Sequence, residues 1–321
     1  MPAAALPAES PFDRRRYPDG FAFHDWIAAD GWASRAYRWP AARTHPRGSL
    51  LFQSGRADFI EKYLEACDHW HRDGWAIEGF DWRGQGGSRG DAPPRAADDR
   101  LSFDPLIDDF AAFVANWQAR TPGPHVIVAH SMGGHVALRT CAERGIAPDA
   151  LVLVAPMLAL DTRRLPVWIA RRLVSAMVAI GRGGRAAWHD DVDDPRRQGR
   201  LTGSRERYED SQWWKQRMPS LATGSPSWNW LAAAMAGERR IARRGAIEGV
   251  RTPVLLLEAG LDQLVSGQAI ERAARRLRDA ELVRFPTARH EILREADDER
   301  LAALLAIDAF LDRRAVAHRP G

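Results

Sequence analysis

The chain contains little cysteine, almost no lysine and no long apolar run. Its two cysteines, Cys67 and Cys141, are too few for a disulfide framework, and we expect buried thiols without a catalytic role. No stretch approaches the ~20 apolar residues that a membrane-spanning helix needs. Residues 1–20 also lack the apolar core of a signal peptide. The sequence therefore argues against a disulfide-rich secreted protein and predicts a cytoplasmic location.

Lysine is scarce because arginine supplies nearly all of the positive charge. Lys62 and Lys215 are the only lysines among 46 basic residues, and the formal net charge is +4. The sequence has no dense basic run and no nucleic-acid-binding motif, so we predict no nucleic-acid partner. The sequence pI of about 9.5 still allows attraction to anionic surfaces.

Short apolar runs alternate with helical patterns along most of the 321 residues. This alternation is typical of βα units, in which parallel strands are buried between helices. We therefore predict an α/β fold with a mostly parallel sheet flanked by helices. The expected strands are Ser49–Gln53, Ala76–Phe80, His125–Ala129, Ala150–Ala155, Pro253–Glu258 and Glu281–Phe285. The expected helices are Phe59–Arg72, Pro105–Ala119, Gly133–Glu143, Gly267–Leu277 and Ala296–Arg314.

The alternation stops after Pro156 and resumes near Val250. We interpret residues 157–245 as an inserted helical cap, or lid, and residues 1–156 and 246–321 as the core. Residues 163–217 carry 13 basic and 7 acidic side chains, so the excess positive charge of the chain lies in this insertion. It also holds nearly half of the 13 tryptophans, namely Trp168, Trp188, Trp213, Trp214, Trp228 and Trp230.

The segment Leu165–Ile180 has the pattern of a helix within this insertion. Pro166 is expected in its first turn and Gly181 at its end, and Arg171 and Arg172 accompany a broad apolar face. Two interpretations remain open. The helix is a lid that covers an acyl pocket or touches a lipid surface, or it packs on the core with its arginines in water.

Residues 125–134, HVIVAHSMGG, form an apolar strand that ends at Ser131 and opens into a run of small residues. Ala129, Ser131 and Gly133 fit a G-x-S-x-G nucleophile elbow, with alanine in the first glycine position. Such a tight strand-to-helix turn displays a serine hydroxyl above the sheet. The sequence therefore predicts Ser131 as a nucleophile, against the alternative of a serine that only caps a helix.

A serine nucleophile needs a histidine base and a carboxylate that orients the histidine. Asp262 and His290 each follow an expected strand, in the order serine, acid, histidine. Because the carboxyl ends of parallel strands meet at one edge, we expect these side chains to converge. Asp161 is a rival for the acid. His130 is adjacent to the serine, and strand alternation predicts that its side chain points away from the nucleophile.

An oxyanion hole requires two backbone donors near the serine. The N–H of Met132, at the start of the helix, and that of Arg56, in the loop after Ser49–Gln53, are the candidates. The glycine-rich segment Asp81–Ser88 lacks the lysine and the spacing of a phosphate loop, so we expect a structural turn beneath the site. The histidine spacings support no metal site, and we predict no metal and no cofactor.

Several motifs in one order make the chain resemble the α/β-hydrolase superfamily, in its lysophospholipase and monoacylglycerol-lipase-like branch. The similarity covers about Ser49 to Leu311, and more loosely the insertion. Ser54 stands where many relatives have histidine, and Ala129 where they have glycine. The matching residues are Gly55-Arg56, Glu61-Lys62-Tyr63, Asp81–Ser88, the elbow at Ser131, Asp262, His290-Glu291, Leu201-Thr202, Arg207-Tyr208 and Pro226–Trp228.

The resemblance implies the α/β-hydrolase fold and a cofactor-independent serine hydrolase that cleaves a lysophospholipid or a monoacylglycerol. Ser131 would attack the ester, His290 would move the proton and Asp262 would hold His290. The expected partner is a small lipid ester, with peripheral contact to a membrane surface. Two alternatives remain, a carboxylesterase for short acyl groups and a non-catalytic binding protein with the same fold.

Overall fold

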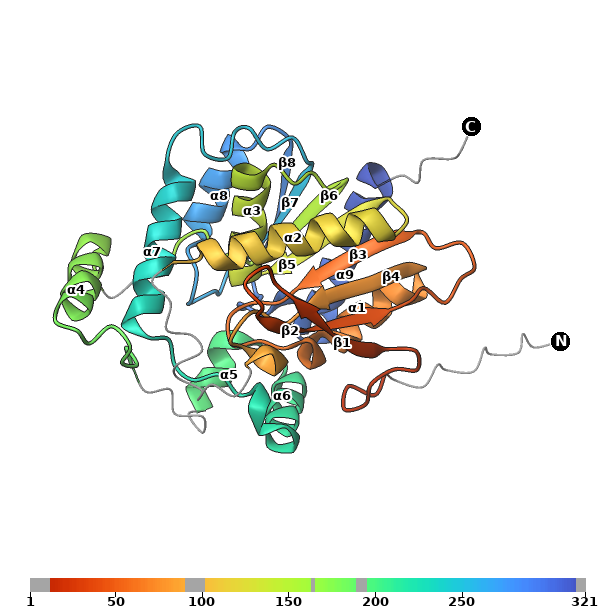
Figure 1. Cartoon of the computed structure of the whole chain (residues 1–321), viewed down its shortest axis with the longest axis horizontal. Helices are drawn as coiled ribbons and strands as arrows, with labels where there is room; N and C mark the ends of the chain where they lie inside the picture. The colour runs from red at the N-terminus through yellow and green to blue at the C-terminus, as the bar shows by residue number, and fades with distance from the viewer. Residues whose placement is uncertain (1–11, 90–101, 163–164, 189–194, 316–321) are drawn as a thin grey trace.

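The computed structural model describes residues 12–89, 102–162, 165–188 and 195–315. An eight-stranded sheet runs through the molecule in the order β1-β2-β4-β3-β5-β6-β7-β8 (Figure 1). The strands from β3 to β8 are parallel, whereas β2 pairs antiparallel with both β1 and β4. The strands are β1 (Ala22–Ile27), β2 (Ala33–Trp39), β3 (Gly48–Gln53), β4 (Trp75–Phe80), β5 (His125–His130), β6 (Ala150–Val154), β7 (Val254–Ala259) and β8 (Ala280–Phe285).

Helices pack on both faces of this sheet. In the described part of the chain they are α1 (Leu64–Arg72), α2 (Asp104–Arg120), α3 (Met132–Arg144), α4 (Val167–Ala179), α5 (Pro195–Leu201), α6 (Arg205–Arg217), α7 (Trp228–Ala242), α8 (Gly267–Arg276) and α9 (Asp297–Arg314). Single 3-10 turns lie at η1 (Ile60–Tyr63), η2 (Gly86–Ser88), η3 (Pro219–Leu221) and η4 (Ile292–Arg294).

Side-chain alternation along the strands divides the interior into two cores. On β5, Ile127 and Ala129 pack with α2, α3 and α8, whereas Val126 and Val128 pack with α1 and α9. A parallel strand that is buried on both faces must be apolar throughout, which is why these strands are readable as continuous runs. The predicted α/β-hydrolase fold is confirmed, and all six expected strands are present.

The edge hairpin of β1 and β2 was not predicted from the sequence. β1 is only partly buried and carries His24 and Asp25 between its apolar residues, so it has no continuous apolar run. An antiparallel edge strand needs only one apolar face, and its signal is correspondingly weaker. The hairpin extends the sheet at the end remote from β7 and β8.

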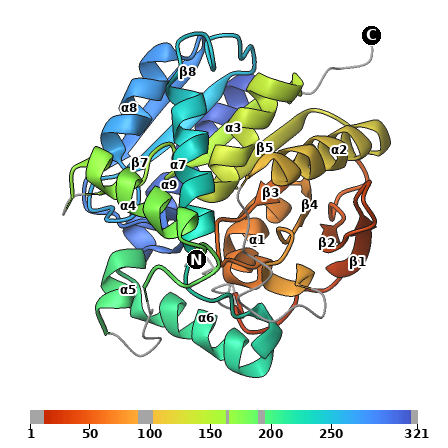
Figure 2. The ribbon, with the colours of Figure 1, turned by 60° about the vertical axis from the view of Figure 1, so that its left-hand side comes forward.

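The residues between β6 and β7 (155–253), here called the β6–β7 segment, contain α4, α5, α6 and α7. Figures 1 and 2 both show α4 beside α7, and α5 beside α6, so the segment forms two helix pairs. The helix expected at Leu165–Ile180 is α4. Pro166 is its N-cap rather than part of its first turn, and Gly181 follows its end with a positive φ of 73°.

Candidate active site

Ser131 occupies a strained turn between β5 and α3. Its φ of 51° and ψ of −116° are unusual for a residue with a side chain. Its N–H donates to the carbonyl of Val154 (3.0 Å). A Cβ at Gly133 would meet the carbonyl oxygens of Gln53 (2.8 Å) and Ser54, and backbone cannot move aside as a flexible side chain can. Glycine is thus required where α3 meets β3, as the elbow pattern predicts.

The structure brings the three predicted side chains into one hydrogen-bonded chain. The Ser131 hydroxyl donates to Nε2 of His290 (2.8 Å), and Nδ1 of His290 donates to Oδ2 of Asp262 (2.7 Å). Oδ1 of Asp262 accepts from the N–H groups of Leu264 (2.7 Å) and Val265 (3.1 Å). Each residue follows a different parallel strand, β5, β7 or β8, so the common sheet edge produces the convergence.

The protonation state of these three side chains follows from the pairing of two buried groups, His290 and Asp262. Burial disfavours the imidazolium, but the charge and hydrogen bond of Asp262 outweigh it and raise the pKa of His290 above its usual value. Burial also opposes ionisation of Asp262, yet the charge and hydrogen bond of His290 lower the pKa of that carboxyl. The arrangement therefore favours a proton on His290 when the serine loses its own.

The loop after β3 lies directly against the nucleophile. A Cβ at Gly55 would lie 3.0 Å from Cβ of Ser131, so this loop passes as close as a glycine allows. Arg56 follows it and lines the same cavity as Ser131. Met132 is the first residue of α3 and is fully buried. Both backbone positions expected to form an oxyanion hole thus flank Ser131.

The glycine-rich segment after β4 supports that loop. The indole N–H of Trp82 donates to the carbonyl of Ser54 (2.7 Å), and the side-chain oxygen of Gln85 accepts from the N–H of Ala57 (2.6 Å). Ala57 has a positive φ of 58°, so the loop needs such external bonds to hold its shape. The expectation of a structural turn beneath the site is confirmed.

His130 lies against His290, a contact that was not predicted from the sequence. The His130 ring is 4.8 Å from that of His290 between centroids, and its Nε2 donates to the His290 carbonyl (3.2 Å). Its Nδ1 lies 3.0 Å from the Tyr63 hydroxyl, which is 2.9 Å from Asp58. Alternation does place His130 on the other side of β5 from Ala129, but the loop after β8 crosses that side.

A buried cluster of charged side chains lies beside His130 and was also not predicted from the sequence. Lys62 bonds to Glu291 (2.6 Å) and to Asp58, and Arg294 also pairs with Glu291. Although burial opposes it, these cations lower the pKa of Glu291 to about 2. The sequence offered two signals for this cluster, namely the scarcity of lysine and the family resemblance of the segments around Lys62 and Glu291. Neither signal indicated which residues would be in contact.

A cavity of about 860 Å³ opens at Ser131 and His290. Asp161, the rival acid, also lines it, but the carboxylate bonded to His290 is that of Asp262. Arg56 reaches across to the β6–β7 segment, where it donates to the Gly224 carbonyl (2.8 Å) and stacks on Trp230 (5.1 Å). The β6–β7 segment supplies most of the apolar lining, including Leu165, Ala170, Leu173, Val174, Trp188, Trp228, Trp230, Leu231 and Met235.

The remaining sequence predictions concern cysteines, metals and membrane spans. Cys67 and Cys141 are buried free thiols, as expected, and burial raises the pKa of Cys141 to about 12. Among the described residues, no group of three or more His, Cys, Asp or Glu side chains is arranged to hold a metal ion. In the same residues, no helix is long and apolar enough to cross a membrane.

Comparison with known proteins assigns the family. The Hydrolase_4 family, described as serine aminopeptidase S33, matches residues 44–297. The chain belongs to this family. It is 32% identical over 298 residues to lysophospholipase L2 of Escherichia coli strain K12. The alignment covers 85% of this chain and 82% of the relative. This Hydrolase_4 protein is therefore a carboxylic-ester hydrolase that is similar to lysophospholipases.

Solved structures of related hydrolases share the fold of this Hydrolase_4 protein. A soluble variant of monoglyceride lipase from Saccharomyces cerevisiae superposes with a TM-score of 0.75 and 17% identity, covering 95% of this chain and 99% of that one. Monoacylglycerol lipase of Paleococcus ferrophilus gives a TM-score of 0.67 and 18% identity, covering 88% and 99%. At these identities the likeness concerns the fold.

Proposed function

We propose that the protein hydrolyses the ester of a single-chain lipid through an acyl-enzyme on Ser131. The observation that carries this proposal is the set of hydrogen bonds that joins Ser131, His290 and Asp262, next to a cavity with a largely apolar wall. Ser131 Oγ attacks the ester carbonyl while His290 Nε2 takes its proton. His290 then passes that proton to the leaving glycerol oxygen, and the acyl group remains on Ser131.

The second half of the reaction uses the same groups in reverse. His290 takes a proton from a water molecule, whose oxygen attacks the acyl carbonyl and releases the fatty acid with Ser131 restored. In both halves negative charge develops on the carbonyl oxygen. The N–H groups of Arg56 and Met132 stabilise it, and the N-terminus of α3 adds its positive dipole end.

The proposed substrates are lysophospholipids or monoacylglycerols. Lysophospholipase L2 of E. coli and the monoacylglycerol lipases act on such molecules according to their names. The cavity volume and its aromatic and aliphatic lining suit an acyl chain. A carboxylesterase for short acyl groups is the competing function, since it would need the same triad and less apolar surface.

A chain-length panel tests this assignment. Monoacylglycerols and lysophospholipids should be cleaved with a kcat/KM that rises about fourfold per added methylene, because burial of each contributes roughly 0.8 kcal/mol, until the chain fills the cavity. Esters of short acids, assayed under identical conditions, should be poorer substrates. A maximum at acetyl or butyryl esters would instead identify a short-chain carboxylesterase.

We further propose that α4 touches a lipid surface. Trp168 on α4 and Ile180 at its C-cap are 60% and 63% exposed, whereas Ala170 and Val174 on α4 pack into the core. The guanidinium of Arg172 lies over the Trp168 ring (5.5 Å), so a cation and an aromatic ring share the outer face. This combination favours peripheral binding to anionic membranes.

Vesicle cosedimentation tests the membrane contact. The wild-type protein should sediment with phosphatidylglycerol vesicles at low salt and less at high salt, because the charge contribution is screened. Trp168→Ala should weaken the binding, whereas Leu305→Ala, which removes a 55% exposed apolar side chain on α9, should not. Absence of wild-type binding even at low salt would rule the contact out.

A further inference from the structure

The cavity has two chemically different walls. The helix pair α4 and α7 contributes aliphatic and aromatic side chains, among them Val174, Trp230 and Met235. The pair α5 and α6 contributes three cations, Arg197, Arg200 and Lys215, together with neutral polar groups and one leucine, Leu201. A ligand that filled this space would be amphipathic, with its polar end toward α5 and α6.

Lys215 is the most unusual of these cations. Tyr208, Ser211, Gln212 and Lys215 all line the cavity and recur at helical spacing, so one face of α6 is turned toward it. Among the described residues the ammonium has no hydrogen bond or ion pair, and it lies 6.0 Å from the centre of the Phe59 ring. Burial, with repulsion from Lys62 and Arg197, lowers the pKa of Lys215 to about 7.

No carboxylate of the described residues forms an ion pair with Lys215, and the attraction of Asp58 and Glu291 only partly offsets the effect of burial. Asp58 and Glu291 are already paired with Lys62, and Glu291 also with Arg294. Asp161 supplies the third carboxylate of the lining, and its backbone N–H donates to the Leu264 carbonyl (2.9 Å). The only two lysines of the chain both line this cavity. Within the described ranges, Lys62 is ion-paired with two carboxylates and Lys215 with none.

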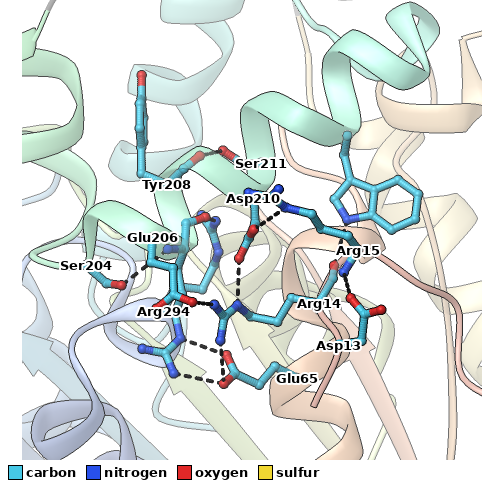
Figure 3. A network of polar contacts seen from close by, with 12 residues as sticks. Asp13, Arg14, Arg15, Glu65, Ser204, Glu206, Tyr208, Asp210, Ser211 and Arg294 are labelled. Atoms are coloured by element: carbon cyan, nitrogen blue, oxygen red, sulfur yellow. Dashed lines mark hydrogen bonds and ion pairs between the residues drawn. The ribbon is translucent and has the colours of Figure 1, made fainter. Parts of the chain in front are cut away.

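The orientation of α6 is fixed by ion pairs on its other side. Figure 3 shows Asp210 between Arg14 (2.6 Å) and Arg15 (2.7 Å), with Tyr208 pointing away from them. Arg207 is bound to Glu65 of α1 through two hydrogen bonds (2.7 and 2.8 Å). The cavity-facing side of the helix is therefore in place before a ligand arrives, which lowers the cost of binding.

We propose that Lys215, with Arg197 and Arg200, forms a subsite for the phosphate group in the headgroup of a single-chain lipid. This subsite rests on the proposed function, because the acyl ester must lie at Ser131 while the phosphate reaches α5 and α6. Phosphate oxygens accept several charge-assisted hydrogen bonds at once, which suits three cations that line one side of the cavity. A monoacylglycerol offers no charge to this wall, so the subsite selects lysophospholipids.

The test compares one acyl chain on two headgroups. Lysophosphatidylglycerol and monoacylglycerol are assayed with wild type, Lys215→Met and Lys215→Arg. Lys215→Met should raise KM for the phospholipid about tenfold or more, the cost of one charge-assisted hydrogen bond, and leave KM for monoacylglycerol unchanged. Lys215→Arg should restore most of the loss. The control is Arg217→Met, which removes an exposed cation from the same helix and should alter neither KM.

Thermal unfolding separates binding from a structural role. A lysine whose pKa is lowered in the folded state destabilises the fold fully below that pKa, and the penalty disappears as pH rises toward the unfolded value. At pH 7, Lys215→Met should therefore unfold at a higher temperature than wild type. If Lys215→Met failed to fold, the subsite would be tested by Arg197→Gln, with the same selective rise in the phospholipid KM expected.

Three results would overturn the subsite. The first is an equal KM increase for both substrates in Lys215→Met, and the second is no KM increase for lysophosphatidylglycerol in that variant. The third is inhibition of monoacylglycerol hydrolysis by micromolar inorganic phosphate that depends on Lys215, which would assign the cations to free phosphate. Failure of the proposed function has a different signature, because wild type would then cleave neither lipid.

Discussion

Ser131→Ala should abolish lipid-ester hydrolysis, with a decrease in kcat on the order of 10^6-fold. The reason is that no other hydroxyl is bonded to Nε2 of His290 in the described structure, so no acyl-enzyme can form. A fluorophosphonate probe should label the wild-type protein and leave the variant unlabelled. Both are measured on the same preparation, by turnover and by labelling.

The fold of the Ser131→Ala variant should be preserved. The Ser131 side chain does not cap α3, and within the described structure its hydroxyl bonds only to His290. Circular dichroism and thermal unfolding should therefore match wild type closely. Ser266→Ala, which alters another N-cap serine without a side-chain cap bond, is the matched control and should retain labelling. A folded wild-type protein that resists the probe would refute the serine mechanism.

Asp262→Asn should reduce kcat by about 10^4-fold at neutral pH. Oδ1 of residue 262 accepts two backbone N–H groups, and an asparagine oxygen would keep these bonds. Its amide NH₂ would then face Nδ1 of His290 and place the imidazole proton on Nε2. A protonated Nε2 cannot accept the proton of Ser131, so the variant holds the base in the wrong tautomer.

The pH profile gives this prediction a second measurement. The reaction needs neutral His290, so wild-type kcat/KM should fall as pH drops through the pKa of His290, which Asp262 raises above the usual ~6.5. Without that carboxylate the pKa falls, and the acidic limb of the residual activity should move to lower pH. Asp161→Asn should have a much smaller effect on kcat. A larger loss from Asp161→Asn than from Asp262→Asn would transfer the acid role.

The predicted side chains converge because their positions depend on strand ends. Ser131, Asp262 and His290 each follow a buried parallel strand, and such strands are readable as apolar runs bounded by turns. Gly133 and Gly134 made the elbow recognisable in the sequence because close packing leaves no room for a side chain there. At both positions a Cβ would lie within 3 Å of neighbouring atoms, so the packing demand appears directly as glycine.

The helices of the β6–β7 segment were less predictable, and α6 most of all. Its buried residues include Arg207 and Asp210 besides Trp214, because ion pairs with other elements replace part of the usual apolar stripe. A helix buried through charge pairs has no clear apolar period. Its partners, such as Arg14 and Glu65, lie far away in the sequence, so their pairing could not be inferred.

The sequence alone determined the fold class, the strand ends and the three residues at those ends, since local apolar pattern and glycine placement encode them. Only the tertiary structure decided which charges meet. It placed His130 against His290, neutralised Lys62 with two carboxylates, and left Lys215 facing the cavity beside other cations. Such contacts join residues from separate elements, and their energies depend on burial and distance, which no local pattern records.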